Sequence, residues 1–148
     1  MKSITLIVGI CILFCLNSFS QDFKKLGDSE VDKSKVKIAQ DFATNYLTKL
    51  KNGTAYKFQD EAIDAFKNQL TEENQKIVYQ QLKDKFGDFQ SLEYVETWVQ
   101  GINKSIQIIR FKSDFVKSNK KLEIRVVLNE SNKIAGFWII PWSDMLKF

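Results

Sequence analysis

The chain has 148 residues, a formal net charge of +4 and no histidine, and its cysteines are Cys11 and Cys15. Both cysteines lie near the start, so the rest of the chain lacks the side chains of disulfides, Cys/His zinc sites and His- or Cys-based catalysis. We therefore expect no metal and no cofactor. The positive charge comes mainly from lysines spread along the chain, which is typical of a solvated surface rather than a nucleic-acid site.

Residues 1–20 have the pattern of a signal peptide. A positively charged start precedes an apolar run at residues 4–16, and small residues stand at Ser18 and Ser20. We expect cleavage before Gln21. The expected location is therefore outside the cytoplasm, in the periplasm or secreted.

The remaining residues match one domain in size. Residues 21–33 are polar and are expected to be a flexible lead-in, residues 34–141 to form a single domain, and residues 142–148 to be a tail. No later apolar run reaches the about 18 residues that a membrane span needs. We expect no membrane span after signal cleavage.

Helical spacing of apolar residues predicts a first helix that Asp32 or Ser34 caps. Asn52 and Gly53 end it, since glycine suits the left-handed position after a helix. Its apolar stripe runs over four turns. The stripe contains Val36, Ala39, Phe42, Ala43, Tyr46, Leu47 and Leu50.

Two further helices are expected before the pattern changes. Residues 56–70 have a less regular apolar face and predict a short second helix. Thr71 is the expected cap of a third helix, with Glu72 and Glu73 in its first turn, where the helix dipole favours acids. Gly87 ends this helix.

From Phe89 onward apolar residues recur at every second position, which predicts strands. Four strands are expected: from Phe89 to a turn at 101–103, and over residues 105–112, 122–128 and 134–140. Pro141 closes the last one because it cannot continue a ladder. Short turns between successive strands indicate an antiparallel meander. The predicted class is α+β, with three N-terminal helices packed on a curved four-stranded antiparallel sheet, like a cone.

Three stretches carry a resemblance to a known family. They are residues 51–53, residues 70–73 with 86–89, and residues 127–141. Together they resemble the nuclear-transport-factor-2-like superfamily, a group of α+β cones, and within it the bacterial domain of unknown function 3887. The likeness covers residues 36–141. It implies a cavity between sheet and helices that holds ligands in some members, and dimers across the outer sheet face in others.

Four residues are candidates for ligand binding. Tyr94, Trp98 and Trp138 would line an apolar pocket, or else belong to the core, as such rings more often do. Arg110 shares strand parity with Ile108. If that parity faces the helices, Arg110 is an anion anchor at the cavity mouth; if not, it lies on the outer surface, which we favour because an unpaired buried arginine is costly.

Charged groups offer two weaker candidates. Asp60 and Asp64 stand one turn apart on the expected second helix. They could act as two general bases or bind a cation, but such residues more often form a solvated acidic face. Basic residues gather around one hairpin, either as a patch for an acidic partner or as protection of a strand edge. They are Lys117, Lys120, Lys121 and Arg125.

Three functions stay open. The first is an exported non-catalytic domain that binds a small apolar ligand or a protein partner. The second is a small isomerase- or dehydratase-type enzyme that uses a carboxylate in the cone cavity. The third is a homodimeric interaction module, which Phe137, Ile139 or Trp142 on the outer sheet face would support.

Overall fold

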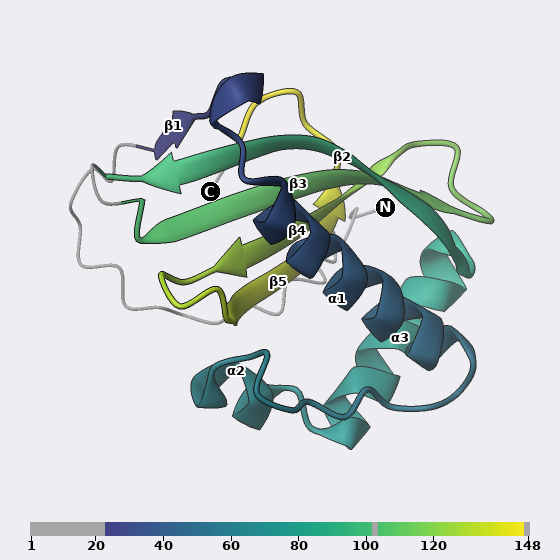
Figure 1. Ribbon diagram of the computed structural model, residues 1–148. Helices are drawn as coiled ribbons and strands as arrows, with labels where there is room; N and C mark the ends of the chain where they lie inside the picture. The colour runs from purple at the N-terminus through teal and green to yellow at the C-terminus, as the bar shows by residue number, and fades with distance from the viewer. Residues whose placement is uncertain (1–22, 102–103, 147–148) are drawn as a thin grey trace, which may run out of the picture.

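The computed structural model describes residues 23–101 and 104–146 (Figure 1). The expected signal peptide at residues 1–20 lies outside the described residues. Within them, a short strand comes first, three α-helices follow, and four long strands end the fold. The α+β class, the three helices and the antiparallel sheet are confirmed.

The first helix, α1 (Lys33–Lys51), forms where its cap and apolar stripe place it. The Asp32 carboxylate accepts hydrogen bonds from the Ser34 amide at 2.9 Å and the Ser34 hydroxyl at 2.6 Å. These bonds satisfy a main-chain donor that the first turn leaves free. Gly53 has φ +78°, so it ends the helix in the left-handed region that favours glycine.

The second helix, α2 (Asp64–Gln69), is shorter than the 56–70 that the sequence predicts. The missing part is extended because it pairs with a strand: the Ile63 amide donates to the Ile134 carbonyl at 3.0 Å, and the Ile134 amide donates to the Glu61 carbonyl at 2.8 Å. These long-range hydrogen bonds replace a turn of helix.

The third helix, α3 (Glu72–Phe86), begins at Thr71, whose hydroxyl accepts from the Asn74 amide at 3.2 Å. It ends at Gly87, with φ +80° and ψ −168°, a conformation that is nearly restricted to glycine. A Cβ at this position would come within 2.9 Å of the Lys117 amide nitrogen. The same glycine therefore stops the helix and lets the hairpin after the third strand approach.

Over the residues that the structure describes, the sheet has five strands rather than the four that the sequence predicts. Their order is β1-β2-β3-β4-β5, and every neighbouring pair is antiparallel. The strands are β1 (Phe23–Lys25), β2 (Phe89–Gln100), β3 (Ile106–Phe115), β4 (Leu122–Leu128) and β5 (Ile134–Pro141). The extra strand comes from the expected lead-in. β1 pairs along β2, from Phe23 opposite Gln100 to Lys25 opposite Trp98.

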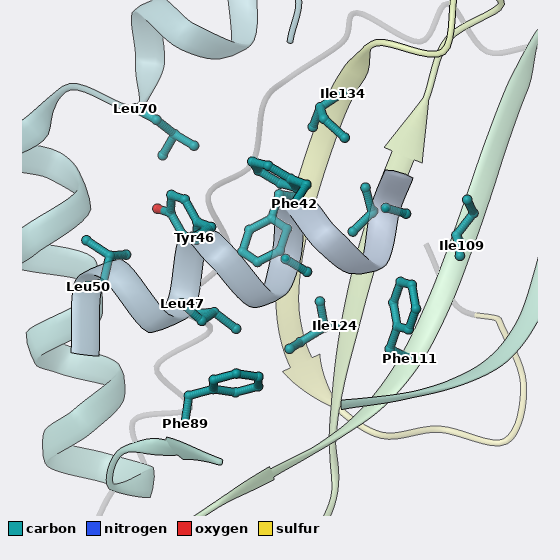
Figure 2. Close-up of a cluster of buried hydrophobic side chains, with 14 of the residues drawn as sticks. Phe42, Tyr46, Leu47, Leu50, Leu70, Phe89, Ile109, Phe111, Ile124 and Ile134 are labelled. Atoms are coloured by element: carbon teal, nitrogen blue, oxygen red, sulfur yellow. The ribbon is translucent and has the colours of Figure 1, made fainter. Parts of the chain in front are cut away.

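The three α-helices lie on one face of the twisted sheet (Figure 1). Figure 2 shows Phe42 and Leu47 of α1 among sheet side chains that include Ile109 and Phe111 of β3 and Ile124 of β4. Aromatic rings fill much of this space. Phe42, Tyr46, Tyr56, Phe58, Phe66 and Phe137 form a continuous cluster of ring contacts. Burial of large rings therefore contributes much of the core's stability.

Candidate functional site

A group of charged side chains lies on the sheet face that points away from the helices. The register places Glu96 of β2 opposite Arg110 of β3, and Arg110 opposite Arg125 of β4. Glu123 shares the face of Arg125 because successive side chains of a strand alternate between faces. All four residues are buried, and we refer to them as the charged cluster.

Arg110 holds the charged cluster together. Its Nε and Nη2 atoms donate to the two carboxylate oxygens of Glu123, at 2.9 and 2.7 Å, and its Nη1 pairs with Glu96 Oε1. Arg125 Nε donates to Glu123 Oε1 at 2.7 Å. A bidentate arginine–carboxylate pair is a strong and geometrically specific contact.

Segments from both ends of the described chain cover this cluster. Lys25 of β1 pairs with Glu96 Oε2 at 2.6 Å. After β5, the Ser143 carbonyl accepts from Arg110 Nη2 at 2.6 Å, and the Trp142 ring lies 4.6 Å from the guanidinium carbon. In Figure 1 this yellow segment runs behind the sheet, on the side away from α1. The expected tail is thus docked on the outer face as far as Ser143.

The sequence places Arg110 on the correct face but predicts the wrong exposure. Ile109 and Phe111 do face the helices, so Arg110 faces away from them; its exposed fraction, however, is 0 %. Desolvation is tolerated because Glu96 and Glu123 neutralise the guanidinium. An arginine that two carboxylates already neutralise is poorly suited to anchor an external anion.

Neighbouring charges and hydrogen bonds favour the ionised forms of Glu96 and Arg110. Burial alone would raise the pKa of Glu96, but hydrogen bonds from Lys25, Trp98 and Arg110 outweigh it and hold that pKa below its usual value. Burial alone would lower the pKa of Arg110, and its bonds to Glu123 and Glu96 reverse this and raise the pKa. The cluster therefore has the chemistry of a structural ion-pair network rather than of an acid–base pair.

Tyr94 lies on the helix-facing side of the sheet. Its ring centroid is 6.1 Å from that of Phe111, the cross-strand neighbour, and its hydroxyl is 3.0 Å from Thr97 Oγ1. The ring is half-buried and packs against the edge of the core. Tyr94 therefore packs as part of the core, the alternative that the sequence analysis favours.

The two candidate tryptophans point to the opposite side. Trp98 Nε1 donates to Glu96 Oε1 at 2.8 Å on the outer face. The Trp138 ring lies over Gly136, where an added Cβ would come within 2.4 Å of the ring carbons. The structure thus joins Trp98 to Arg110 through Glu96, but Tyr94, Trp98 and Trp138 do not line a common pocket.

The acidic candidates, Asp60 and Asp64, do not face the space between the helices and the sheet. α2 begins only at Asp64, so Asp60 lies in the preceding loop and the expected one-turn spacing on a helix is wrong. Both residues are exposed. The hydrogen bond and charge of Lys67, 2.8 Å away, hold the pKa of Asp64 below its usual value, the opposite of what a general base requires.

A small pocket lies on the helix side of the sheet, between α1, α3 and β5, and its volume is about 20 Å³. We refer to it as the β5 pocket. It is lined by Tyr46, Leu47, Leu50, Val78, Tyr79, Leu82, Phe137, Trp138 and Ile139. Because the Trp138 ring points to the other face, Trp138 lines the pocket through its main chain. The walls are apolar apart from two tyrosine hydroxyls and main chain.

Tyr46 is the unusual residue of the β5 pocket. Its exposed fraction is 2 %, and its hydroxyl has no hydrogen-bond partner among the described residues. Figure 2 shows this oxygen pointing away from Phe42, towards the α3 side. Burial raises the pKa of Tyr46, so the hydroxyl keeps its proton and is available as a donor. A buried polar group without a partner is uncommon in folded proteins.

Residues 43–137 match a protein family described as "Protein of unknown function (DUF3887)". The chain belongs to the DUF3887 family. No curated protein and no solved structure matches it. The superfamily membership that the sequence analysis expects therefore stays a prediction.

The DUF3887 match contains Tyr46 and the whole charged cluster, whereas β1 and the segment at Trp142 and Ser143 lie outside it. In the described part of the chain no helix is long and apolar enough to cross a membrane. The same residues contain no group of three acidic, histidine or cysteine side chains that could hold a metal ion.

The sequence pattern did not single out Tyr46 or the two glutamates of the charged cluster. Tyr46 is part of the apolar stripe of α1, and nothing in the pattern shows that its hydroxyl lacks a partner. The glutamates left a weak signal: Glu123 and Arg125 share strand parity, as Arg110 does with Ile108. Opposite charges at matching parity on neighbouring strands indicate an ion pair only once the register is known.

Proposed function

We propose that this domain is a non-catalytic binding module, and that its site is the β5 pocket. The occupant is a small, neutral and mainly apolar group with one hydrogen-bonding atom. The observation that carries this proposal is the Tyr46 hydroxyl, buried beside the pocket without a partner. An unpaired buried hydroxyl costs about 1–3 kcal/mol, which a bound acceptor atom would recover.

The size of the pocket limits what enters it. A volume of about 20 Å³ is enough for one water-sized group, since one water needs about 10–15 Å³ on this measure. The buried part of the occupant is therefore a single hydroxyl or a methyl-sized tip, and the rest of the occupant lies outside.

The lining supports a neutral occupant. Within the described residues, the pocket walls include no carboxylate and no basic side chain. An ion would lose its hydration there without a compensating charge. This argues for the binding alternative over an isomerase or dehydratase, which would need a carboxylate facing the cavity.

The proposal includes export of the domain from the cytoplasm. Export is inferred from the positive charge, the apolar run and the small residues in the first twenty positions. The binding module would then act outside the cytoplasm, in the periplasm or beyond the cell.

Phenol and benzene are suitable probes because they differ by one hydroxyl. In ¹H–¹⁵N spectra of the purified protein we expect phenol to shift the amides of Leu50, Val78 and Ile139, which line the pocket. Benzene has no hydroxyl that could enter the pocket, so it should shift none of these amides. Tyr46→Phe should weaken phenol binding about 3- to 10-fold, the effect of one neutral hydrogen bond.

The matched control is Tyr94→Phe, since the Tyr94 hydroxyl already has Thr97 as partner and does not line the pocket. It should respond to phenol and to benzene as the wild type does. If phenol shifts no pocket amide, or if Tyr46→Phe binds it unchanged, the proposal is wrong.

A further inference from the structure

We infer that the occupant of the β5 pocket is a side chain from an extended segment of another protein, which adds to the sheet beside β5. This inference rests on the proposed function and names the partner class. Its basis is the position of the pocket beside an edge of the sheet that no described strand covers beyond Gly136.

Among the described residues, β5 is the last strand of the sheet, and the strand beside it is β4. At its start, the Ile134 amide and carbonyl pair with residues 61 and 63, through an isolated parallel bridge at Ala62. From Gly136 onward no other strand of the described chain pairs with this edge. Figure 1 shows β5 at the border of the sheet. The edge of β5 thus forms main-chain hydrogen bonds to an extended segment at Ile134. From Gly136 onward, no described strand pairs with it.

The hydrogen-bond pattern between β4 and β5 shows which main-chain groups of β5 do not bond to β4. The Trp142 amide donates to the Lys121 carbonyl at 3.3 Å, just beyond the pair of Leu122 and Pro141. Hydrogen-bonded and non-hydrogen-bonded pairs alternate along an antiparallel ladder. The main-chain groups of Phe137 and Ile139 therefore point away from β4.

The pocket lies beside these open groups. Phe137 and Ile139 line it with their helix-facing side chains, and Trp138 lines it with main chain. A strand added to β5 would lie about 4.8 Å away and direct every second side chain to the helix side. One of these side chains would reach the β5 pocket and meet the Tyr46 hydroxyl. Serine or threonine fits, because each has a neutral hydroxyl on a small side chain.

A second copy of this chain fits the site less well. In a β5-to-β5 pair the helix-facing side chains of the second copy would again be Phe137 and Ile139. Phe137 is 3 % exposed in its own core, so it cannot enter a neighbour's pocket. Phe137 and Ile139 point to the helix side of the sheet. They are therefore not on the outer sheet face, where the expected homodimer would need them.

The test uses a fluorescein-labelled heptapeptide of alternating valine and threonine, titrated against the purified protein by fluorescence anisotropy. We expect binding, and protection of the Phe137 and Ile139 amides from hydrogen exchange. N-methylation of the alternate residues that pair with β5 should weaken binding at least tenfold. Methylation of the other alternate set is the matched control and should leave binding unchanged.

The two probes separate this inference from the pocket proposal. Phenol tests the pocket alone, and the pair of methylated peptides tests pairing with β5. Phenol binding without peptide binding, or equal binding of both methylated peptides, overturns the inference and leaves the pocket proposal standing. Failure of both probes overturns both. Protection of Phe137 and Ile139 by a second copy, or by residues 1–22, also overturns the inference.

Discussion

Arg110 is a single charge whose burial depends on residues far apart in the sequence. Its partners come from β2, from β4 and from the segment after β5. The ring of Trp142 covers the guanidinium and also lies 4.5 Å from Lys112 Nζ. Removing one member of such a network costs more than the network itself contributes, because the partners stay buried without compensation.

We expect Arg110→Ala to lower the free energy of unfolding by about 3–5 kcal/mol, since Glu96 and Glu123 would remain as buried carboxylates. Urea unfolding followed by circular dichroism measures this. Replacing all four cluster residues together, by Arg110→Met and Arg125→Met with Glu96→Leu and Glu123→Leu, should recover most of the loss. A single variant within about 0.5 kcal/mol of the wild type would contradict the role of Arg110.

At the scale of elements, one buried side chain fixes the extended loop between α1 and α2. Gln75 of α3 is 1 % exposed. Its Oε1 accepts from the Tyr56 amide at 2.8 Å, and its Nε2 donates to the carbonyls of Tyr56 at 3.0 Å and Leu70 at 2.8 Å. A helix is thus tied to a loop that makes no regular ladder of its own.

Gln75→Leu keeps a similar volume but removes all three hydrogen bonds. We expect the free energy of unfolding to fall by about 2–3 kcal/mol, because main-chain groups of Tyr56 and Leu70 lose their partner. The matched control is Gln80→Leu on the same helix, where the exposed side chain bonds only Asp84. Equal stability of the two variants, measured by urea unfolding, would show that Gln75 does not hold the loop.

For the whole molecule, charges that are paired in the folded state link stability to pH. The lowered pKa of Glu96 means that the unfolded chain binds this proton more readily than the folded protein does. Its contribution is therefore present above the usual pKa of 4.5 and is lost as the pH falls below it. Asp64 and Asp88 have pKa shifts of the same sign.

Thermal unfolding should thus show a melting temperature that falls as the pH drops from about 5 towards 3. Glu96→Gln should be less stable at neutral pH, and its melting temperature should fall less steeply with acid. Glu93→Gln, an exposed position on the same strand, is the control and should follow the wild type. An unchanged slope in Glu96→Gln would remove Glu96 from the cause of acid sensitivity.

Features that depend on near neighbours along the chain could be predicted from the residues alone. The caps at Asp32 and Thr71, the glycines at 53 and 87 and the two periodicities predict α1, α3 and the four long strands. Each signal acts within a few residues, so a pattern is enough to find it. The alternation of side chains along β3 likewise allows the prediction that Arg110 lies on the outer face of the sheet.

Features that depend on partners distant in sequence became visible only in the folded protein. β1 and the shortened α2 take their form from pairing with β2 and with Ile134. The burial of Arg110 needs segments from both ends of the described chain, and the unpartnered hydroxyl of Tyr46 is visible only when α3 and β5 surround it. No local pattern encodes these contacts, because each arises where independently formed elements meet.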